Sequence, residues 1–254
     1  KAFYYMNINL NKIPVVDLFA GPGGLGEGFA SLKQDDGSNA FQSVVSIERD
    51  NSAHQTLHLR HFLRAFPDGK FPDEYYKYLS GKISKKSLYD KFPKQKIHAD
   101  ESALKISLGD ENADIVHRII KEKINGAKAW ALVGGPPCQA YSLVGRSRMK
   151  HDPEFSNDKR HFLYKEYLNI IADHAPPVFV MENVKGLLSS KVGDEFVIDM
   201  ILSDLKAPKQ ALNRNGTDLE YKLYGLAGDS FHGMVENPRE FIVKAEEYGV
   251  PQAR

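Results

Sequence analysis

Short runs of apolar, mostly β-branched residues alternate along the chain with longer segments in which apolar residues recur at helical spacing. The expected strands are residues 13–19, 43–48, 129–133, 178–181 and 241–244. The expected helices are residues 24–32, 51–66, 110–124, 160–173 and 194–205. This alternation predicts an α/β fold, a mainly parallel sheet with helices on both faces. Ligands of such sheets bind beyond the carboxyl ends of the strands, so the residues that follow each run are candidates for chemistry.

Residues 67–96 interrupt this pattern and are rich in Lys, Tyr, Phe and Pro. We interpret them as an insertion made of short helices and loops. Aromatic residues interleaved with lysines also occur where proteins contact nucleic acids. Because aromatic side chains are more often buried, a small core within the insertion is the favoured interpretation.

The composition is that of a soluble globular protein of 254 residues with a net charge of only +1. A dedicated nucleic-acid-binding protein usually carries a clear basic excess, so contact with DNA would depend on local clusters. One cluster lies within residues 82–96 and another within residues 146–160. We expect an intracellular, cytoplasmic protein without membrane contact, because there is no long apolar run and no signal-like start.

A glycine-rich turn follows the first expected strand, in the sequence VVDLFAGPGGLG of residues 15–26. Glycines permit a tight turn and let a ligand approach the backbone, although dinucleotide sites contain such turns too. The next strand ends in Glu48, where a carboxylate can accept both ribose hydroxyls of an adenosine. A surface carboxylate is the alternative for Glu48, and the upstream turn favours nucleoside binding.

Cys138 is the only cysteine, and it follows the expected strand 129–133 within the sequence GGPPCQAYS of residues 134–142. A single cysteine can form neither an internal disulfide nor a cysteine-rich metal site, so we expect no metal. The two prolines stiffen the loop that leads to the thiol. A rigid loop at the end of a strand suits a nucleophile better than it suits a buried structural cysteine.

A second carboxylate follows an apolar run in the sequence VFVMENVKGL of residues 178–187. Glu182 comes directly after the strand and Asn183 comes next. A carboxylate in this position is unusual unless it is paired, functional or a capping group. Glu182 is therefore a candidate for chemistry on the same edge of the sheet as Cys138.

Together these segments resemble the cytosine-C5 DNA methyltransferase family. The matching residues, in the family's order, are the DLFAG of residues 17–21, the PPCQ of residues 136–139, the ENV of residues 182–184 and the closing GVPQAR of residues 249–254. The resemblance covers residues 13–254, with 67–96 as an insertion. It implies a Rossmann-like methyltransferase domain that uses S-adenosylmethionine and releases S-adenosylhomocysteine.

The resemblance also implies the catalytic residues. Cys138 would add to C6 of a cytosine flipped out of the duplex, which activates C5 toward the methyl group. Glu182 would bond the ring N3 and the exocyclic amine, Arg254 would bond O2, and Asn183 would hold the active-site loops.

The cofactor site implied by the resemblance contains Asp17, Phe19, Gly21, Gly23, Gly24, Glu48, Asp100 and Pro137. Phe19 would stack on the adenine and Asp100 would bond the adenine amine. Glu48 would hold the ribose, and the glycines would lie near the methionine portion. Pro137 would line the space around the transferred methyl group.

The family pattern continues beyond Arg254 with a target-recognition region and two further blocks. We therefore expect a catalytic domain without its target-recognition domain, or one that a second chain completes. The expected substrate is double-stranded DNA, in the setting of a bacterial restriction–modification system. Three alternatives remain open: a tRNA cytosine-C5 methyltransferase, a non-catalytic cofactor-binding regulatory subunit, and an NAD-dependent oxidoreductase.

Overall fold

The structure is a computed structural model that describes residues 12–67, 70–137, 163–192, 194–215, 219–226 and 237–251. The chain divides into two compact units. The first unit contains residues 1–136 and 176–182, and the second contains residues 137–175 and 183–254. Each unit is described by itself below.

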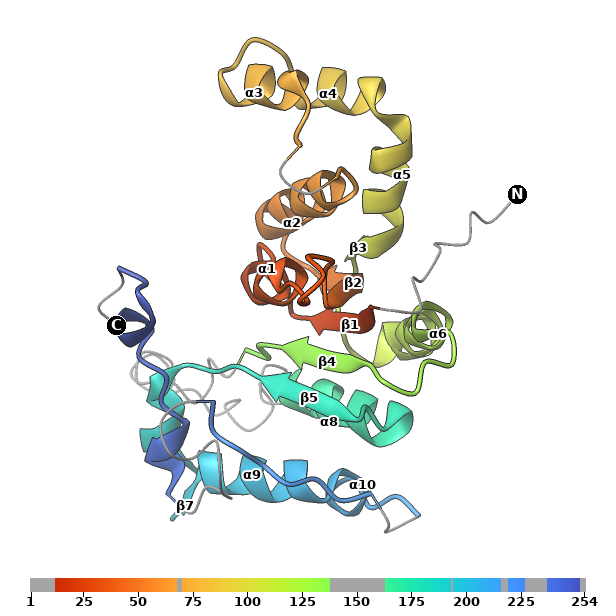
Figure 1. Cartoon of the computed structure of the whole chain (residues 1–254). Coiled ribbons are helices and arrows are strands. Elements are labelled where there is room, and N and C mark those ends of the chain that lie inside the picture. The colour runs from red at the N-terminus through yellow and green to blue at the C-terminus, as the bar shows by residue number, and fades with distance from the viewer. Residues whose placement is uncertain are drawn as a thin grey trace, which may run out of the picture. The chain divides into compact units, whose positions relative to one another are not determined.

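A five-stranded parallel sheet forms the centre of the first unit (Figure 1). Its strands are β1 (Ile13–Leu18), β2 (Phe41–Glu48), β3 (Ala103–Lys105), β4 (Ala131–Gly134) and β5 (Val178–Met181). Their order in the sheet is β3-β2-β1-β4-β5, and all four pairings are parallel. This confirms the predicted α/β fold with a parallel sheet.

The central strands owe their form to apolar, β-branched residues that are buried on both faces. Val15, Val16 and Leu18 of β1 are fully buried, as are Val44, Val45 and Ile47 of β2. Parallel strands covered on both faces read as such near-continuous apolar runs. The sequence pattern missed β3, because three residues, one of them a lysine, give too short a run to detect.

The helices of the first unit that accompany the sheet are α1 (Gly24–Ser31), α2 (Asn51–Arg64) and α6 (Ala113–Ile124), and the 3-10 turn η1 (Asp110–Asn112) precedes α6. All three helices contact β2. Right-handed connections place α1 and α2 on one face of the sheet and α6, which leads from β3 back to β4, on the other. The three helices lie where the pattern predicted them, to within two or three residues at each end.

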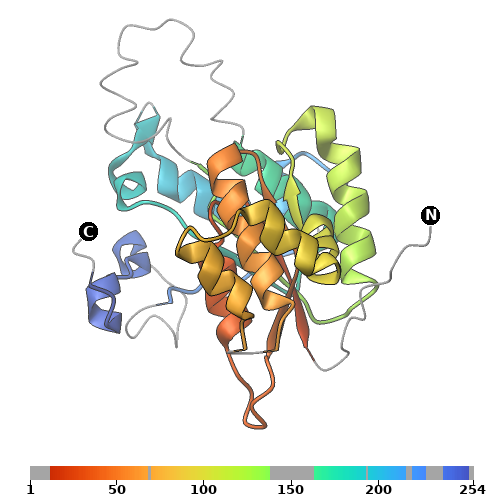
Figure 2. The same ribbon diagram turned by 90° about the horizontal axis from the view of Figure 1, so that it is seen from above.

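The segment after α2 forms three short helices, α3 (Asp73–Leu79), α4 (Lys85–Lys91) and α5 (Pro93–Ser102). They lie on the outer side of α2, as Figures 1 and 2 show. Phe62 of α2 packs with Leu88, Tyr89 and Ala99 in a buried cluster, and further aromatic rings surround it. The aromatic residues of this segment therefore build a small core together with α2. Whether the segment is an insertion stays a prediction.

The second unit contains helices α8 (Leu163–His174), α9 (Val197–Lys206) and α10 (Pro208–Ala211) and a two-stranded sheet of β6 (Lys191–Val192) and β7 (Glu195–Phe196). Its 3-10 turns are η5 (Lys185–Ser189), η7 (Pro238–Phe241) and η8 (Ala245–Tyr248). Helix α10 contacts both α8 and α9. Tyr164 on α8 donates a hydrogen bond to Asp204 on α9, with 2.5 Å between the oxygens. The helices predicted at 160–173 and 194–205 correspond to α8 and α9, and α9 begins three residues later than predicted.

The strand predicted at residues 241–244 is wrong. A 3-10 turn, η7, occupies residues 238–241, and the next three residues form no regular element. Pro238 stands at the start of the turn, and the Asn237 side chain caps it by accepting a hydrogen bond from the Arg239 backbone. Proline after an asparagine cap favours a helical start, and this local signal outweighs the short apolar run.

Candidate active site

The carboxyl ends of four strands bring the candidate residues of the first unit to one edge of the sheet. The turn of residues 19–23 follows β1, and Glu48 is the last residue of β2. Gly135 and Pro136 follow β4, and Glu182 follows β5. This is the edge at which open parallel sheets bind their ligands.

The turn after β1 has a strained backbone. Phe19 has a φ of 55°, a left-handed value that bulky residues rarely adopt, and Gly21 and Gly23 have φ values of 55° and 89°. A Cβ on Gly23 would lie 2.8 Å from Cδ1 of Leu57, so a larger residue would collide with α2. Strain of this kind costs on the order of 1–3 kcal/mol and tends to occur at ligand sites. The sequence predicted the turn but gave no sign of the strain at Phe19.

Glu48 holds the turn in place. One carboxylate oxygen accepts a hydrogen bond from the Gly21 backbone at 2.8 Å, and the other accepts one from the Asp50 backbone at 2.6 Å. An ionised carboxylate can accept about four hydrogen bonds, so two positions are left for other donors. The half-buried Glu48 can therefore bind a pair of hydroxyl groups without releasing the turn.

Asp17 is enclosed in the protein instead of facing the open edge. Its side chain is 1% exposed, and neither carboxylate oxygen has a partner with full hydrogen-bond geometry among the described residues, although the Gly26 backbone lies near enough to lower the pKa of the carboxyl. One oxygen lies 2.6 Å from the position that a Cβ on Gly26 of α1 would occupy. Burial raises the pKa of Asp17 to about 7, and the positive charge of Arg64 opposes this rise. A role for Asp17 in a cofactor site stays a prediction.

Glu182 lies against the loop that leads to Cys138. Its backbone donates a hydrogen bond to the Gly134 carbonyl at 2.9 Å. A Cβ on Gly135 would lie 2.8 Å from a Glu182 carboxylate oxygen, so the glycine leaves room for this carboxylate. The exposed side chain of Glu182 can receive a ligand from solvent.

Asn183 belongs to the second unit and lies two residues before η5. Its side-chain oxygen accepts a hydrogen bond from the Val184 backbone at 2.8 Å. Such a local bond fixes the chain where a loop begins. A role for Asn183 in holding a loop stays a prediction, and this geometry is compatible with it.

Asp100 does not join the edge at which its predicted role would place it. It lies on α5, before β3 begins, whereas the carboxyl end of β3 is Lys105. Its carboxylate binds His58 at 2.9 Å and Lys96 at 2.6 Å. Sequence patterns could not place Asp100, because α5 continues to Ser102 and β3 is very short. We therefore leave Asp100 out of the proposed cofactor site.

Three predicted features fall outside the described residues. Cys138, Arg254 and the basic cluster of residues 146–160 are not described, and Pro137 is the last described residue before the cysteine. Within the described ranges, no three His, Cys, Asp or Glu side chains come together as metal ligands. Among the described helices, none has the length and apolar character required to cross a bilayer.

Sequence reasoning missed a buried polar network next to the glycine turn. His61 of α2 is fully buried, and its ring nitrogens lie 2.8 Å from Ser102 Oγ and 3.0 Å from Ser46 Oγ. Arg64 contacts the same ring at 3.3 Å and binds Glu27 of α1 at 2.8 Å. The available signal was spacing: His61 and Arg64 follow Leu57 at helical intervals on the buried face of α2.

The sheet order, the strained glycine turn and the acid at the end of β2 define a Rossmann-like methyltransferase fold. A model of the family of C-5 cytosine-specific DNA methylases matches residues 105–254. The chain belongs to this family.

Several type II methyltransferases are similar to the chain over 94% of its length. M.Bpa9945I of Bacillus paralicheniformis is 30% identical, and the match covers 51% of that protein. M.AquIA of Picosynechococcus is 26% identical with 68% covered, and M.DdeI of Desulfomicrobium norvegicum is 26% identical with 38% covered. The chain thus spans about half the length of the first of these relatives.

Proposed function

We propose that this chain is the cofactor-binding and catalytic part of a DNA (cytosine-5-)-methyltransferase that uses S-adenosylmethionine. The observation that carries the proposal is the position of the Glu182 carboxylate against Gly135, three residues before Cys138. Family membership supplies the class of reaction. The geometry supports the proposal, because Glu182 and Gly135 lie together at one edge of the sheet.

The residues at the ends of β1 and β2 fit S-adenosylmethionine. Glu48 has two free acceptor positions for the ribose hydroxyls, and Gly21 and Gly23 leave the turn open to close approach. Phe19 is half-buried in the same turn and would supply an aromatic face for the adenine. When bound, the cofactor supplies an electrophilic methyl group.

The protein's own part of the reaction concerns the cytosine ring. The Cys138 thiolate would add to C6 and make C5 nucleophilic, while Glu182 would bond N3 and the exocyclic amine and stabilise the charge that develops. Methylation at C5, loss of the C5 proton and expulsion of the thiolate would complete the cycle. Arg254 would hold O2 of the ring.

Covalent trapping tests the proposal. Duplex DNA that contains 5-fluorocytosine should form an adduct with the chain in the presence of S-adenosylmethionine, because fluorine cannot leave as a proton does. Cys138→Ser should abolish the adduct, and Glu182→Gln should slow its formation by on the order of 100-fold or more. An undiminished adduct with Cys138→Ser would contradict the assignment of the nucleophile.

Two further experiments distinguish the proposal from a tRNA methyltransferase and from a regulatory subunit. Labelled methyl transfer to tRNA and not to duplex DNA would favour the tRNA enzyme. Binding of the cofactor without any adduct, even after the remaining family segments have been added as a second chain, would favour a regulatory subunit. We expect the added chain to raise activity, since the relatives extend well beyond the matched length.

The biological setting belongs to the same proposal. The relatives are named type II methyltransferases, which supports a role in a restriction–modification system with double-stranded DNA as the partner. We propose the bacterial cytoplasm as its location, which these relatives support. This setting can be tested by expressing the gene of this protein in a bacterial host that lacks DNA methylation. Bisulfite sequencing of the host DNA would then detect methylated cytosines.

A further inference from the structure

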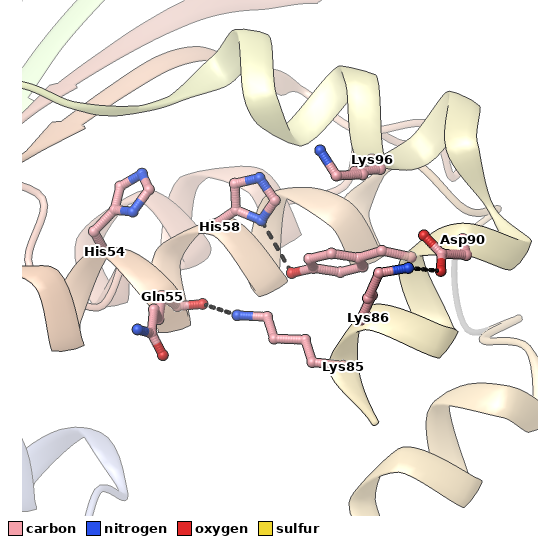
Figure 3. Close-up of a pocket in the computed structure, with 8 residues that line it drawn as sticks. His54, Gln55, His58, Lys85, Lys86, Asp90 and Lys96 are labelled. Atoms are coloured by element: carbon pink, nitrogen blue, oxygen red, sulfur yellow. Dashed lines mark hydrogen bonds and ion pairs between the residues drawn. The ribbon is translucent and has the colours of Figure 1, made fainter. Parts of the chain in front are cut away.

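A pocket of about 480 Å³ lies between α2, α4 and α5 in the first unit (Figure 3). Its lining residues are His54, Gln55, His58, Lys85, Lys86, Tyr89, Asp90 and Lys96. None of them is among the predicted cofactor-binding or catalytic residues. The pocket exists only because α4 and α5 lie against α2, so it is built by the segment predicted to be an insertion.

The lining of the pocket has an excess of basic groups. Three lysines and two histidines face a single carboxylate, that of Asp90. Asp90 binds Lys86 at 2.6 Å, and Lys96 binds Asp100, which lies outside the lining. These pairs neutralise two of the three lysines.

Lys85 is the lysine that remains without an acidic partner among the described residues. Its Nζ donates a hydrogen bond to the backbone carbonyl of Gln55 at 3.0 Å (Figure 3). This bond holds the ammonium of Lys85, a residue of α4, against α2. Burial lowers the pKa of Lys85, since a half-buried ammonium loses part of its hydration. An anion in the pocket would compensate for that loss.

Aromatic side chains form the rest of the wall. The rings of His54 and His58 lie 5.9 Å apart on one side of α2, and the ring of Tyr89 lies 5.3 Å from that of His58. His58 is held in place by the Tyr89 hydroxyl at 3.0 Å and by Asp100 at 2.9 Å. Flat rings beside lysines are the surroundings in which proteins bind bases and phosphates together.

We propose that this pocket binds a nucleoside phosphate, with Lys85 bound to the phosphate and the histidine rings beside the base. The ligand is either a free nucleotide or a nucleotide within a single strand of nucleic acid, since both offer the same groups. The volume falls in the range of sites for small ligands. None of the lining residues is among those proposed to hold the cofactor or the base, so the proposal does not depend on methyltransferase activity.

Thymidine monophosphate is the probe that tests the site, because it contains neither the adenine of the cofactor nor the target cytosine. Binding to the full chain is measured by calorimetry with saturating S-adenosylhomocysteine, which occupies the proposed cofactor site. We expect Lys85→Gln to weaken binding on the order of tenfold, as for loss of one charge-assisted contact. Lys82→Gln removes the same charge from an exposed position outside the pocket and should leave binding unchanged.

Three comparisons complete the experiment. Thymidine without a phosphate should bind on the order of tenfold more weakly than the monophosphate. Lys85→Arg keeps the charge and should retain binding, and its thermal melting checks folding at this position. A short single-stranded DNA separates the two sources of the ligand: if it binds and the monophosphate does not, and if Lys85→Gln weakens it, the ligand belongs to a nucleic-acid strand.

Several results would overturn the proposal. They are no binding of either probe, equal binding of thymidine and its monophosphate, or equal losses for Lys85→Gln and Lys82→Gln. In the wild-type chain, the side-chain resonances of Lys85 and His58 should shift on titration with the monophosphate. Binding without these shifts would place the ligand elsewhere and would also contradict the proposal.

Discussion

Two buried polar regions lie side by side in the first unit and differ in how their polar groups are satisfied. In the first, Asp17 of β1 lies beneath α1 without a partner of full hydrogen-bond geometry among the described residues. In the second, His61 of α2 bonds Ser46 and Ser102 with both ring nitrogens. Arg64 lies between the two regions and influences the pKa of both groups.

The two regions respond to pH in opposite directions. Burial raises the pKa of Asp17 to about 7, so the folded state retains a proton that the unfolded state has lost. Stability therefore falls as pH rises from about 4 to about 7. Burial holds the pKa of His61 well below 6.5, so stability falls as pH drops below that value.

The difference in hydrogen bonding indicates that the region around His61 is a structural network and that the region around Asp17 belongs to a strained site. The His61 network has the complete hydrogen bonding that is usual for buried polar groups. Among the described residues, the Asp17 carboxylate has no partner with full hydrogen-bond geometry, and Asp17 lies two residues before the strained Phe19. Unsatisfied groups and strained backbone that occur together indicate a region shaped by function at the expense of stability.

Asp17→Asn should give the largest effect. A pKa raised from 3.8 to about 7 costs the folded state roughly 4 kcal/mol once the carboxyl is ionised. The variant should therefore gain stability relative to the wild type between pH 4 and pH 8, by up to that amount. Urea unfolding at a series of pH values measures the difference.

Asp36→Asn is the matched control for Asp17→Asn. Asp36 is exposed, and its bonds to Ser38 lower the pKa of its carboxyl, so the variant should not gain stability as pH rises. If the stability difference between Asp17→Asn and the wild type is the same at pH 4 and pH 8, Asp17 is not protonated in the folded state.

His61→Ala should give the second largest effect, a loss of about 3 kcal/mol in the free energy of unfolding. The change removes the bonds to Ser46 and Ser102 and leaves a cavity in a fully buried position. His54→Ala on the same helix removes one bond, to the Ala103 carbonyl, from a half-buried position and should cost about 1 kcal/mol. Equal losses would mean that the network adds nothing beyond a single hydrogen bond.

The sequence allowed the sheet and its edge to be predicted, because patterns along the chain determine them. Apolar runs marked β1, β2, β4 and β5, and the carboxylates at or just after the ends of two of these runs marked Glu48 and Glu182. The sequence did not reveal what depends on contacts between distant segments. Asp17 is enclosed by α1, His61 meets residues of β2 and α5, and Asp100 turns toward His58. The missed β3 and the wrong strand at 241–244 show the limit of short apolar runs.

Gly26→Ala tests how closely α1 packs on Asp17. The new Cβ would lie 2.6 Å from a carboxylate oxygen, so the helix or the aspartate must shift, at a cost of about 2 kcal/mol. Gly28 on the same helix serves as the control, because a Cβ added there would have no atom within 4 Å. Gly28→Ala should therefore stabilise the protein by about 0.5–1 kcal/mol. In an Asp17→Ser background the penalty of Gly26→Ala should shrink. A penalty that stays the same would place the collision elsewhere.

Arg64→Met should have the smallest effect, and it tests whether Arg64 links the two regions. The guanidinium opposes the rise in the pKa of Asp17, so its removal should raise that pKa further above 7, by about half a pH unit. The same positive charge helps to lower the pKa of His61, so removing it should raise the pKa of His61 as well.

Both titration midpoints can be followed by NMR of the Asp17 carboxyl carbon and the His61 ring. Arg60→Met is the control, because Arg60 also pairs with Glu27 but does not affect either pKa. If only one midpoint moves in Arg64→Met, the two regions titrate independently, and the contrast between them is a property of their hydrogen bonding alone.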